Sequence, residues 1–198
     1  MTCMRHMAIS VMASFALVAS ATDAVLAQTS GKFISDKDAV HMNDISEPTA
    51  NEAAKRFLAF VSRMNQLSEA SAEGLEKALG LSFGREGTVA GYRSAAGPDG
   101  WQYFVDFYFR DPPLRNGFSF EFVNLGGSTD LSPVCFDFDL LRSTLHKAGF
   151  DEQKRVGEIG ELISFNYFKN DVKLAVIIQS PTTGDVNRNC VRRIQTLQ

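Results

Sequence analysis

The chain has 198 residues, of which 44% are hydrophobic and 22% are charged, with 20 Lys and Arg against 23 Asp and Glu. This composition is that of a globular protein rather than a disordered or fibrous one. The net charge of −3 argues against a nucleic-acid-binding protein, which needs a basic face.

Residues 1–27 have the pattern of a secretory signal peptide. One basic residue, Arg5, precedes an apolar run over residues 7–21. Small residues at cleavage spacing occur at 19–21 and at 25–27, and the second is the preferred cleavage site. The run is shorter than the roughly 20 apolar residues that a membrane-spanning helix needs. We therefore expect an exported protein, periplasmic or secreted, with no membrane anchor once the signal is cleaved.

Two cysteines follow the signal, Cys135 and Cys190. Two cysteines in an oxidising compartment usually pair. The alternative is a free nucleophilic thiol, for which His41 and His146 are the only candidate bases. We predict a disulfide, which would close a loop of more than 50 residues.

Residues 28–47 are polar and are expected to form a flexible arm, in which residues 32–35 could make a short strand. Residues 48–198 are expected to form a single domain.

Apolar residues recur at helical spacing in the first part of this domain. The pattern predicts a helix that begins near Pro48, bends or restarts at Ser68 or Ser71, and ends at Gly80.

A period of two replaces the helical period after this helix. It predicts antiparallel strands at 88–94, 101–110 and 118–123, separated by turns rich in Gly and Pro. The odd positions of 101–110 are all apolar and predict a face that packs under helices. The even positions mix aromatic and charged residues.

A second helix is predicted to start near Ser132 or Asp137 and to end at Gly149. Residues 162–169 and 172–179 then form a hairpin. Its predicted register pairs three sets of apolar residues on one face: Tyr167 with Leu174, Phe165 with Val176, and Ile163 with Ile178.

The segment 189–196 fits either a helix or a strand. A strand is preferred, because the second half of the chain would then repeat the first as a duplicated α-β-β-β unit. The expected fold is α+β, with an antiparallel sheet of five or six strands and two helices on one face.

No motif of a known catalytic mechanism is present, and we expect no cofactor and no metal site. Asp137 and Asp139 could form an acid–base cluster with His146. The preferred interpretation is that these charges occupy the two ends of the second helix, where the helix dipole favours them.

The even positions of strand 101–110 are the best candidate for a binding surface. If helices cover the odd face, aromatic side chains lie outside among charges of both signs, a composition typical of protein interfaces. The alternative is that the N-terminal arm or a crossing helix covers them. The candidate binding residues, which include the neighbouring strand and the tip of the turn at 111–117, are Phe104, Asp106, Tyr108, Arg110, Leu114, Arg115 and Glu121.

The sequence therefore predicts an exported, non-enzymatic protein-binding module of the bacterial envelope. An inhibitor or immunity protein that acts on a cell-wall-active enzyme is its most concrete form. The partner is expected to be another exported or periplasmic protein. The alternatives are an envelope-assembly accessory factor and a hydrolase with an unfamiliar site near His146.

Overall fold

The computed structural model describes residues 47–97, 99–182 and 188–197, all within the unit that spans residues 43–198. The predicted signal peptide, and the N-terminal arm except for Glu47, lie outside these residues. The described part of the chain contains three α-helices and nine strands, which confirms the α+β class. In this part, no helix is long and apolar enough to cross a membrane.

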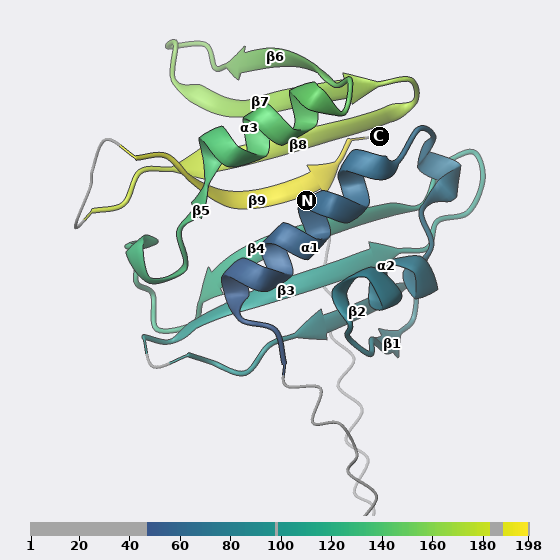
Figure 1. The fold of residues 1–198 in the computed structure, drawn as a ribbon, viewed down its shortest axis with the longest axis horizontal. Coiled ribbons are helices and arrows are strands. Elements are labelled where there is room, and N and C mark those ends of the chain that lie inside the picture. Colours follow the sequence, from purple (N-terminus) through teal and green to yellow (C-terminus); the bar gives the residue numbers. More distant parts are fainter. Residues whose placement is uncertain (1–46, 98, 183–187, 198) are drawn as a thin grey trace, which may run out of the picture. The chain divides into compact units, whose positions relative to one another are not determined.

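The three helices lie on the same face of one antiparallel sheet (Figure 1). The helical segments are α1 (Ala50–Arg63), the short 3₁₀ helix η1 (Leu67–Glu69), α2 (Ala72–Leu79), the 3₁₀ helix η2 (Ser132–Val134) and α3 (Phe138–Lys147). The strands are β1 (Gly84–Glu86), β2 (Val89–Arg93), β3 (Trp101–Tyr108), β4 (Gly117–Asn124), β5 (Phe136–Asp137), β6 (Asp151–Val156), β7 (Leu162–Lys169), β8 (Val172–Gln179) and β9 (Cys190–Thr196).

Side-chain caps define where the helices begin. Thr49 and Glu52 form a reciprocal capping box at the start of α1. Ser71 accepts a hydrogen bond from the Gly74 N–H and starts α2, so the predicted first helix is two helices with a break at one of the two predicted serines. Asp137 caps α3 in the same way, which confirms the predicted start of that helix.

The sheet order is β1-β2-β3-β4-β9-β8-β7-β6, with β5 paired to β9 off this path. Two four-stranded meanders, each preceded by helical segments, therefore meet at the β4–β9 pair. Residues 190–196 form a strand, so the helical alternative for this segment is wrong.

The sheet has more strands than the five or six predicted, and each half repeats a helix followed by four strands rather than three. The additional strands are β1, β5 and β6. Strands β1 and β6 lie at the two edges of the sheet and are largely exposed. They therefore lack the apolar alternation that marks a half-buried strand.

The core lies between the helices and the sheet. The burial of β3 alternates residue by residue as predicted, with Trp101, Tyr103, Val105 and Phe107 buried. Phe57 of α1 packs against β4, with its ring centroid 5.2 Å from that of Phe120. These aromatic contacts fix the position of α1 over the centre of the sheet.

The β7–β8 register is confirmed for Phe165 with Val176 and for Tyr167 with Leu174. The prediction for Ile163 is wrong. The β7–β8 pairing ends at Phe165, and Ile163 is 41% exposed rather than part of the core. Its predicted partner, Ile178, pairs with Val191 of β9 instead. The start of β7 thus remains paired with β6 alone.

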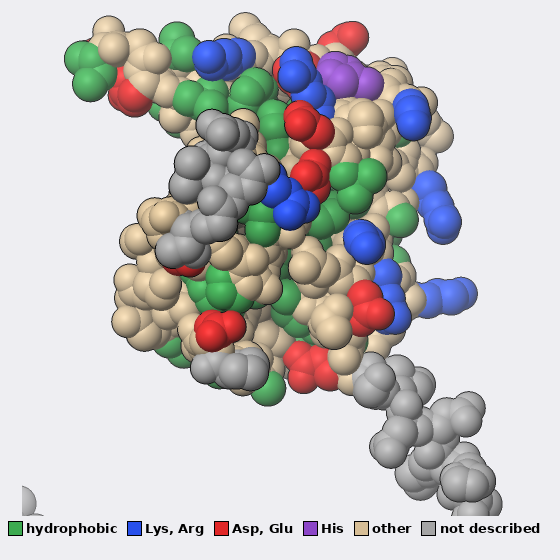
Figure 2. Space-filling model, turned by 60° about the vertical axis from the view of Figure 1, so that its left-hand side comes forward, with side chains coloured by type: hydrophobic (Ala, Val, Ile, Leu, Met, Phe, Trp, Pro, Cys, Tyr) green, Lys and Arg blue, Asp and Glu red, His purple; other side chains and the backbone are tan. Residues whose placement is uncertain are grey.

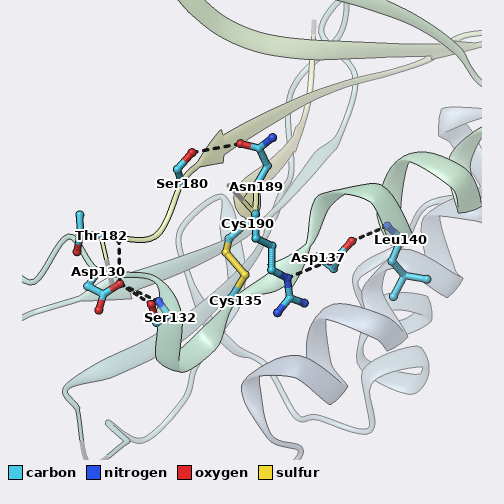
Figure 3. Close-up of a disulfide and its surroundings, with 10 residues drawn as sticks. Asp130, Ser132, Cys135, Asp137, Leu140, Ser180, Thr182, Asn189 and Cys190 are labelled. Atoms are coloured by element: carbon cyan, nitrogen blue, oxygen red, sulfur yellow. Dashed lines mark hydrogen bonds and ion pairs between the residues drawn. A yellow bond between two sulfur atoms is a disulfide. The ribbon is translucent and has the colours of Figure 1, made fainter. Parts of the chain in front are cut away.

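The predicted disulfide joins Cys135 to Cys190 (Figure 3). It links the segment that precedes β5 to the first residue of β9. Two polar contacts hold the same region together: the Phe138 N–H donates to the Asn189 carbonyl at 3.0 Å, and Arg188 Nε lies 3.0 Å from Asp137 Oδ2. The chain is therefore fastened beside the centre of the sheet by both covalent and polar links.

Candidate protein-binding face

The face of the sheet opposite the helices is the candidate site, and we call it the open face. No helix of the described residues covers it (Figure 1). Strand register sets one row of side chains across it: Arg93 of β2, Phe104 of β3, Glu121 of β4, Arg193 of β9 and Ile177 of β8. Directly opposed residues on neighbouring strands project from the same face. Across the sheet, the row therefore presents a cation, an aromatic ring, an anion, a second cation and an aliphatic side chain, in that order.

Arg93 organises one end of this row. Its guanidinium carbon lies 4.4 Å from the centre of the Phe104 ring, within the range of a cation–π contact. Its Nη2 lies 2.6 Å from Asp106 Oδ1. Gly91, opposite Asp106, is required here, because an added Cβ would lie 2.5 Å from that carboxylate oxygen.

Tyr108 continues the polar contacts along β3. Its hydroxyl lies 3.4 Å from Asp106 Oδ2 and 3.1 Å from the hydroxyl of Ser119. The guanidinium carbon of Arg110 lies 5.8 Å from the centre of the Tyr108 ring. The edge of the tyrosine is thus held by hydrogen bonds, and its ring lies beside a second cation.

Glu121 is paired with two arginines of β9. Arg193 donates from Nε to Glu121 Oε2 at 2.8 Å, and Arg192 Nε lies 3.8 Å from Glu121 Oε1. Both arginines reach one carboxylate because the β8–β9 register shifts between Ile177 and Ile178 and leaves Arg192 as an extra residue. The open face therefore carries charges of both signs in fixed positions.

The seven predicted binding residues fall into two groups. Phe104, Asp106, Tyr108 and Glu121 lie together on the open face, and Arg110 adjoins them through Tyr108. Leu114 and Arg115 lie apart from them on the β3–β4 loop, where Arg115 forms an ion pair with Asp171 of the β7–β8 turn.

The second group borders a separate hollow. A pocket of about 550 Å³ lies between the β3–β4 loop, η1 and the β7–β8 turn. Arg110, Leu114 and Arg115 line it together with Leu67 and Asp171. Arg110 thus belongs to the lining of this pocket and also borders the open face.

Sequence reasoning missed three residues of the row, which are Arg93, Arg193 and Ile177. Arg93 lies at the end of a predicted strand, and the register of the β2–β3 hairpin would have placed it opposite Phe104. Arg193 meets Glu121 across 72 positions of sequence, which no local pattern indicates.

The proposed acid–base cluster around His146 does not form. Asp137 lies at the other end of α3, where the backbone hydrogen bond from Leu140, together with Arg188, lowers the pKa of its carboxyl. Asp139 occupies the first turn of α3, and His146 its last turn. These positions match the preferred interpretation, in which the charges complement the helix dipole.

His146 instead adjoins Glu152 of β6, with 3.4 Å between Nε2 and Oε2. The same carboxylate accepts hydrogen bonds from the Tyr167 hydroxyl and from Arg142, each at 2.7 Å. Burial and the neighbouring carboxylate raise the pKa of Tyr167, so its phenol stays protonated. This cluster ties α3 to strands β6 and β7.

No family model, curated protein or solved structure matches this chain. Within residues 47–97, 99–182 and 188–197, no group of three or more His, Cys, Asp or Glu side chains is placed to hold a metal ion. The chemistry of the described surfaces is therefore the basis for a functional interpretation.

Proposed function

We propose that this chain is an exported, non-enzymatic protein-binding module of the bacterial envelope that binds another exported protein through its open face. An inhibitor or immunity protein acting on a cell-wall-active enzyme is the form that we favour. The observation that carries the proposal is the ordered row of Arg93, Phe104, Glu121 and Arg193 on a face that no described helix covers.

The composition of the row supports a protein partner. Aromatic and arginine side chains are enriched at the centres of protein interfaces and account for much of their binding energy. Here the rings of Phe104 and Tyr108 are held by contacts within the chain. Groups that are already ordered lose little conformational freedom on binding, which favours affinity.

The fixed charges support selectivity for one partner. The carboxylates of Asp106 and Glu121 are each paired with an arginine of a neighbouring strand. A partner with complementary charges gains orientation from this pattern, whereas like charges opposite it are strongly unfavourable. This favours one specific target over many weak ones.

The signal-like segment and the disulfide support the location. Disulfides persist in oxidising compartments such as the periplasm and the extracellular space. The Cys135–Cys190 bridge is consistent with such a compartment. The partner that we propose is therefore another exported or periplasmic protein.

The test combines three substitutions, Phe104→Ala, Tyr108→Ala and Arg110→Ala, which we call the face variant. The control removes three exposed side chains from the outer surface of α3, through Leu140→Ala, Ser143→Ala and Lys147→Ala. We expect the wild type and the control to capture one protein stoichiometrically from envelope extract and the face variant to lose it. Binding by the face variant that equals that of the wild type would refute the proposed face.

A separate measurement tests whether the chain inhibits a cell-wall-active enzyme. The captured protein, once purified, is assayed on peptidoglycan with increasing amounts of the wild type. We expect activity to fall to its minimum at one equivalent of the wild type and to be retained with the face variant. Unchanged activity at saturation would exclude inhibition while leaving a binding role.

A further inference from the structure

The end of the β6–β7 hairpin carries an unusual concentration of exposed aliphatic side chains. Seven large hydrophobic residues of the described chain are exposed, and four of them lie between residues 156 and 163. They are Val156 (51% exposed), Ile159 (91%), Leu162 (38%) and Ile163 (41%). We call residues 156–163 the hairpin tip.

The hairpin tip extends beyond the rest of the sheet. Strand β7 pairs with β8 only from Phe165 onward, whereas its pairing with β6 continues to Leu162 opposite Val156. The tip is therefore a two-stranded ribbon without a third strand beside it. In Figure 2 this end of the hairpin is the lobe that projects at the upper left, away from the helices, and hydrophobic and acidic side chains gather on it.

The turn at the apex is well defined. The Gly157 N–H donates to the Glu161 carbonyl at 2.8 Å, and the Gly160 N–H donates to the Gly157 carbonyl at 3.0 Å. Gly160 has a φ of 83°, the left-handed conformation that closes a three-residue hairpin turn. Hydrogen bonds between residues on either side of Ile159 thus fix the backbone of the turn at the apex, so little backbone entropy is lost on binding.

The charge of the hairpin tip indicates the kind of partner. Glu158 and Glu161 lie on either side of Ile159 at the turn, whereas the nearest basic residues in the sequence, Lys154 and Arg155, lie further back on β6. Carboxylates beside an apolar apex disfavour an anionic lipid surface, which attracts basic segments. They favour a surface that pairs apolar side chains with basic ones.

We propose that the hairpin tip inserts Ile159 into an apolar pocket of a protein partner, and that lysine or arginine side chains on the rim of this pocket pair with Glu158 and Glu161. This inference rests on the proposed protein-binding function and adds a second contact element to the open face. Exposed apolar clusters rimmed by polar residues mark interaction sites. A narrow ribbon with one dominant aliphatic residue fits a pocket better than a flat surface.

The experiment places a photo-crosslinking phenylalanine derivative at position 159 of the full chain, which is irradiated in native envelope extract. The control places the same group at position 125, where Leu125 is 73% exposed on the loop after β4. We expect one discrete protein adduct from position 159 and none from position 125. The cross-linked peptide should map to an apolar pocket bordered by basic residues.

Two substitutions at the tip test its chemistry against the purified adduct partner. Ile159→Ser should lower the affinity at least about tenfold, as expected for a central apolar anchor, and Leu125→Ser should leave it unchanged. The charge-reversed pair Glu158→Lys and Glu161→Lys should lower the adduct yield by a similar factor. All variants should unfold at the same urea concentration as the wild type, because the substituted side chains are exposed.

An absent adduct, an adduct with a second copy of this chain or with lipid, or a yield unaffected by charge reversal would overturn the inference. Comparison with the face variant distinguishes failure of the hairpin-tip inference from failure of the proposed function. Loss of binding by the face variant with full binding by Ile159→Ser overturns the hairpin tip alone. The opposite result overturns the open face and leaves the tip as the binding element.

Discussion

Replacing both cysteines of the disulfide, through Cys135→Ala and Cys190→Ala, should destabilise the protein without changing its fold. The native geometry around the bridge has independent support, because β5 pairs with β9 there and Arg188 pairs with Asp137. Cys190 is fully buried. Alanine is therefore preferable to serine at this position, since it leaves no buried hydroxyl without a partner.

The size of the effect follows from the loop that the bridge closes. The two cysteines are 55 positions apart, for which the chain-entropy model gives about 4 kcal/mol of stabilisation, through restriction of the unfolded chain. This is a large part of the roughly 5–15 kcal/mol that stabilises a typical domain. With a urea dependence of about 2 kcal/mol per molar, the unfolding midpoint should fall by roughly 2 M.

Urea unfolding, monitored by tryptophan fluorescence and by far-ultraviolet circular dichroism, measures the free energy of unfolding and the midpoint urea concentration. The double variant should also show a steeper urea dependence, because an unfolded chain without the cross-link exposes more surface. Reductant should shift the wild type toward the variant and leave the variant unchanged. A loss of less than about 1 kcal/mol would refute the assignment of the stabilisation to the unfolded chain.

Two further predictions concern individual residues of the fold and the open face. Gly91→Ala should cost about 1–3 kcal/mol by forcing a Cβ against Asp106 and should weaken partner binding by displacing Arg93. The control Gly84→Ala should leave the urea midpoint unchanged, because the added Cβ would lie 3.9 Å from the Gly91 carbonyl oxygen, an ordinary van der Waals distance. Asp137→Ala should cost about 1 kcal/mol at pH 7 through loss of the α3 cap. Because the folded-state pKa of Asp137 is lowered, this stabilisation is present above the ordinary carboxyl pKa of about 3.9 and is lost as the pH falls through the folded value. Unfolding curves of wild type and variant from pH 7 to pH 2 should therefore converge, and a constant difference would contradict the linkage.

The local patterns of the sequence determine much of the fold. Ser71 and Asp137 start helices because their side chains can cap the first turn, and this property is visible in the sequence. Phe165 and Tyr167 meet the predicted partners in β8 because a two-residue turn fixes the register of a hairpin. Phe104 and Tyr108 lie on the open face because β3 alternates strictly.

The remaining features depend on pairings that local patterns do not contain. Ile163 has the pattern of a core residue, yet β8 pairs with β7 only as far as Val176 and with β9 alone beyond it, so the exposure of Ile163 follows from the pairing of a neighbouring strand. The Arg193–Glu121 pair depends on the β4–β9 junction between the two meanders. The hairpin tip was not predicted for the same reason as β6. An edge strand that is largely exposed need not alternate apolar and polar residues.

The position of β9 in the sheet has a consequence for the order in which the protein can be built. Strands β1 to β8 all precede β9 in the chain, yet β9 lies between β4 and β8 and joins the two meanders. As the polypeptide leaves the ribosome, the first meander ends in an unpaired β4 edge, and the second ends in an unpaired β8 edge. Neither edge is closed, and Cys135 has no partner, until residues 190–196 emerge. Native assembly of the sheet is therefore delayed until this segment is available.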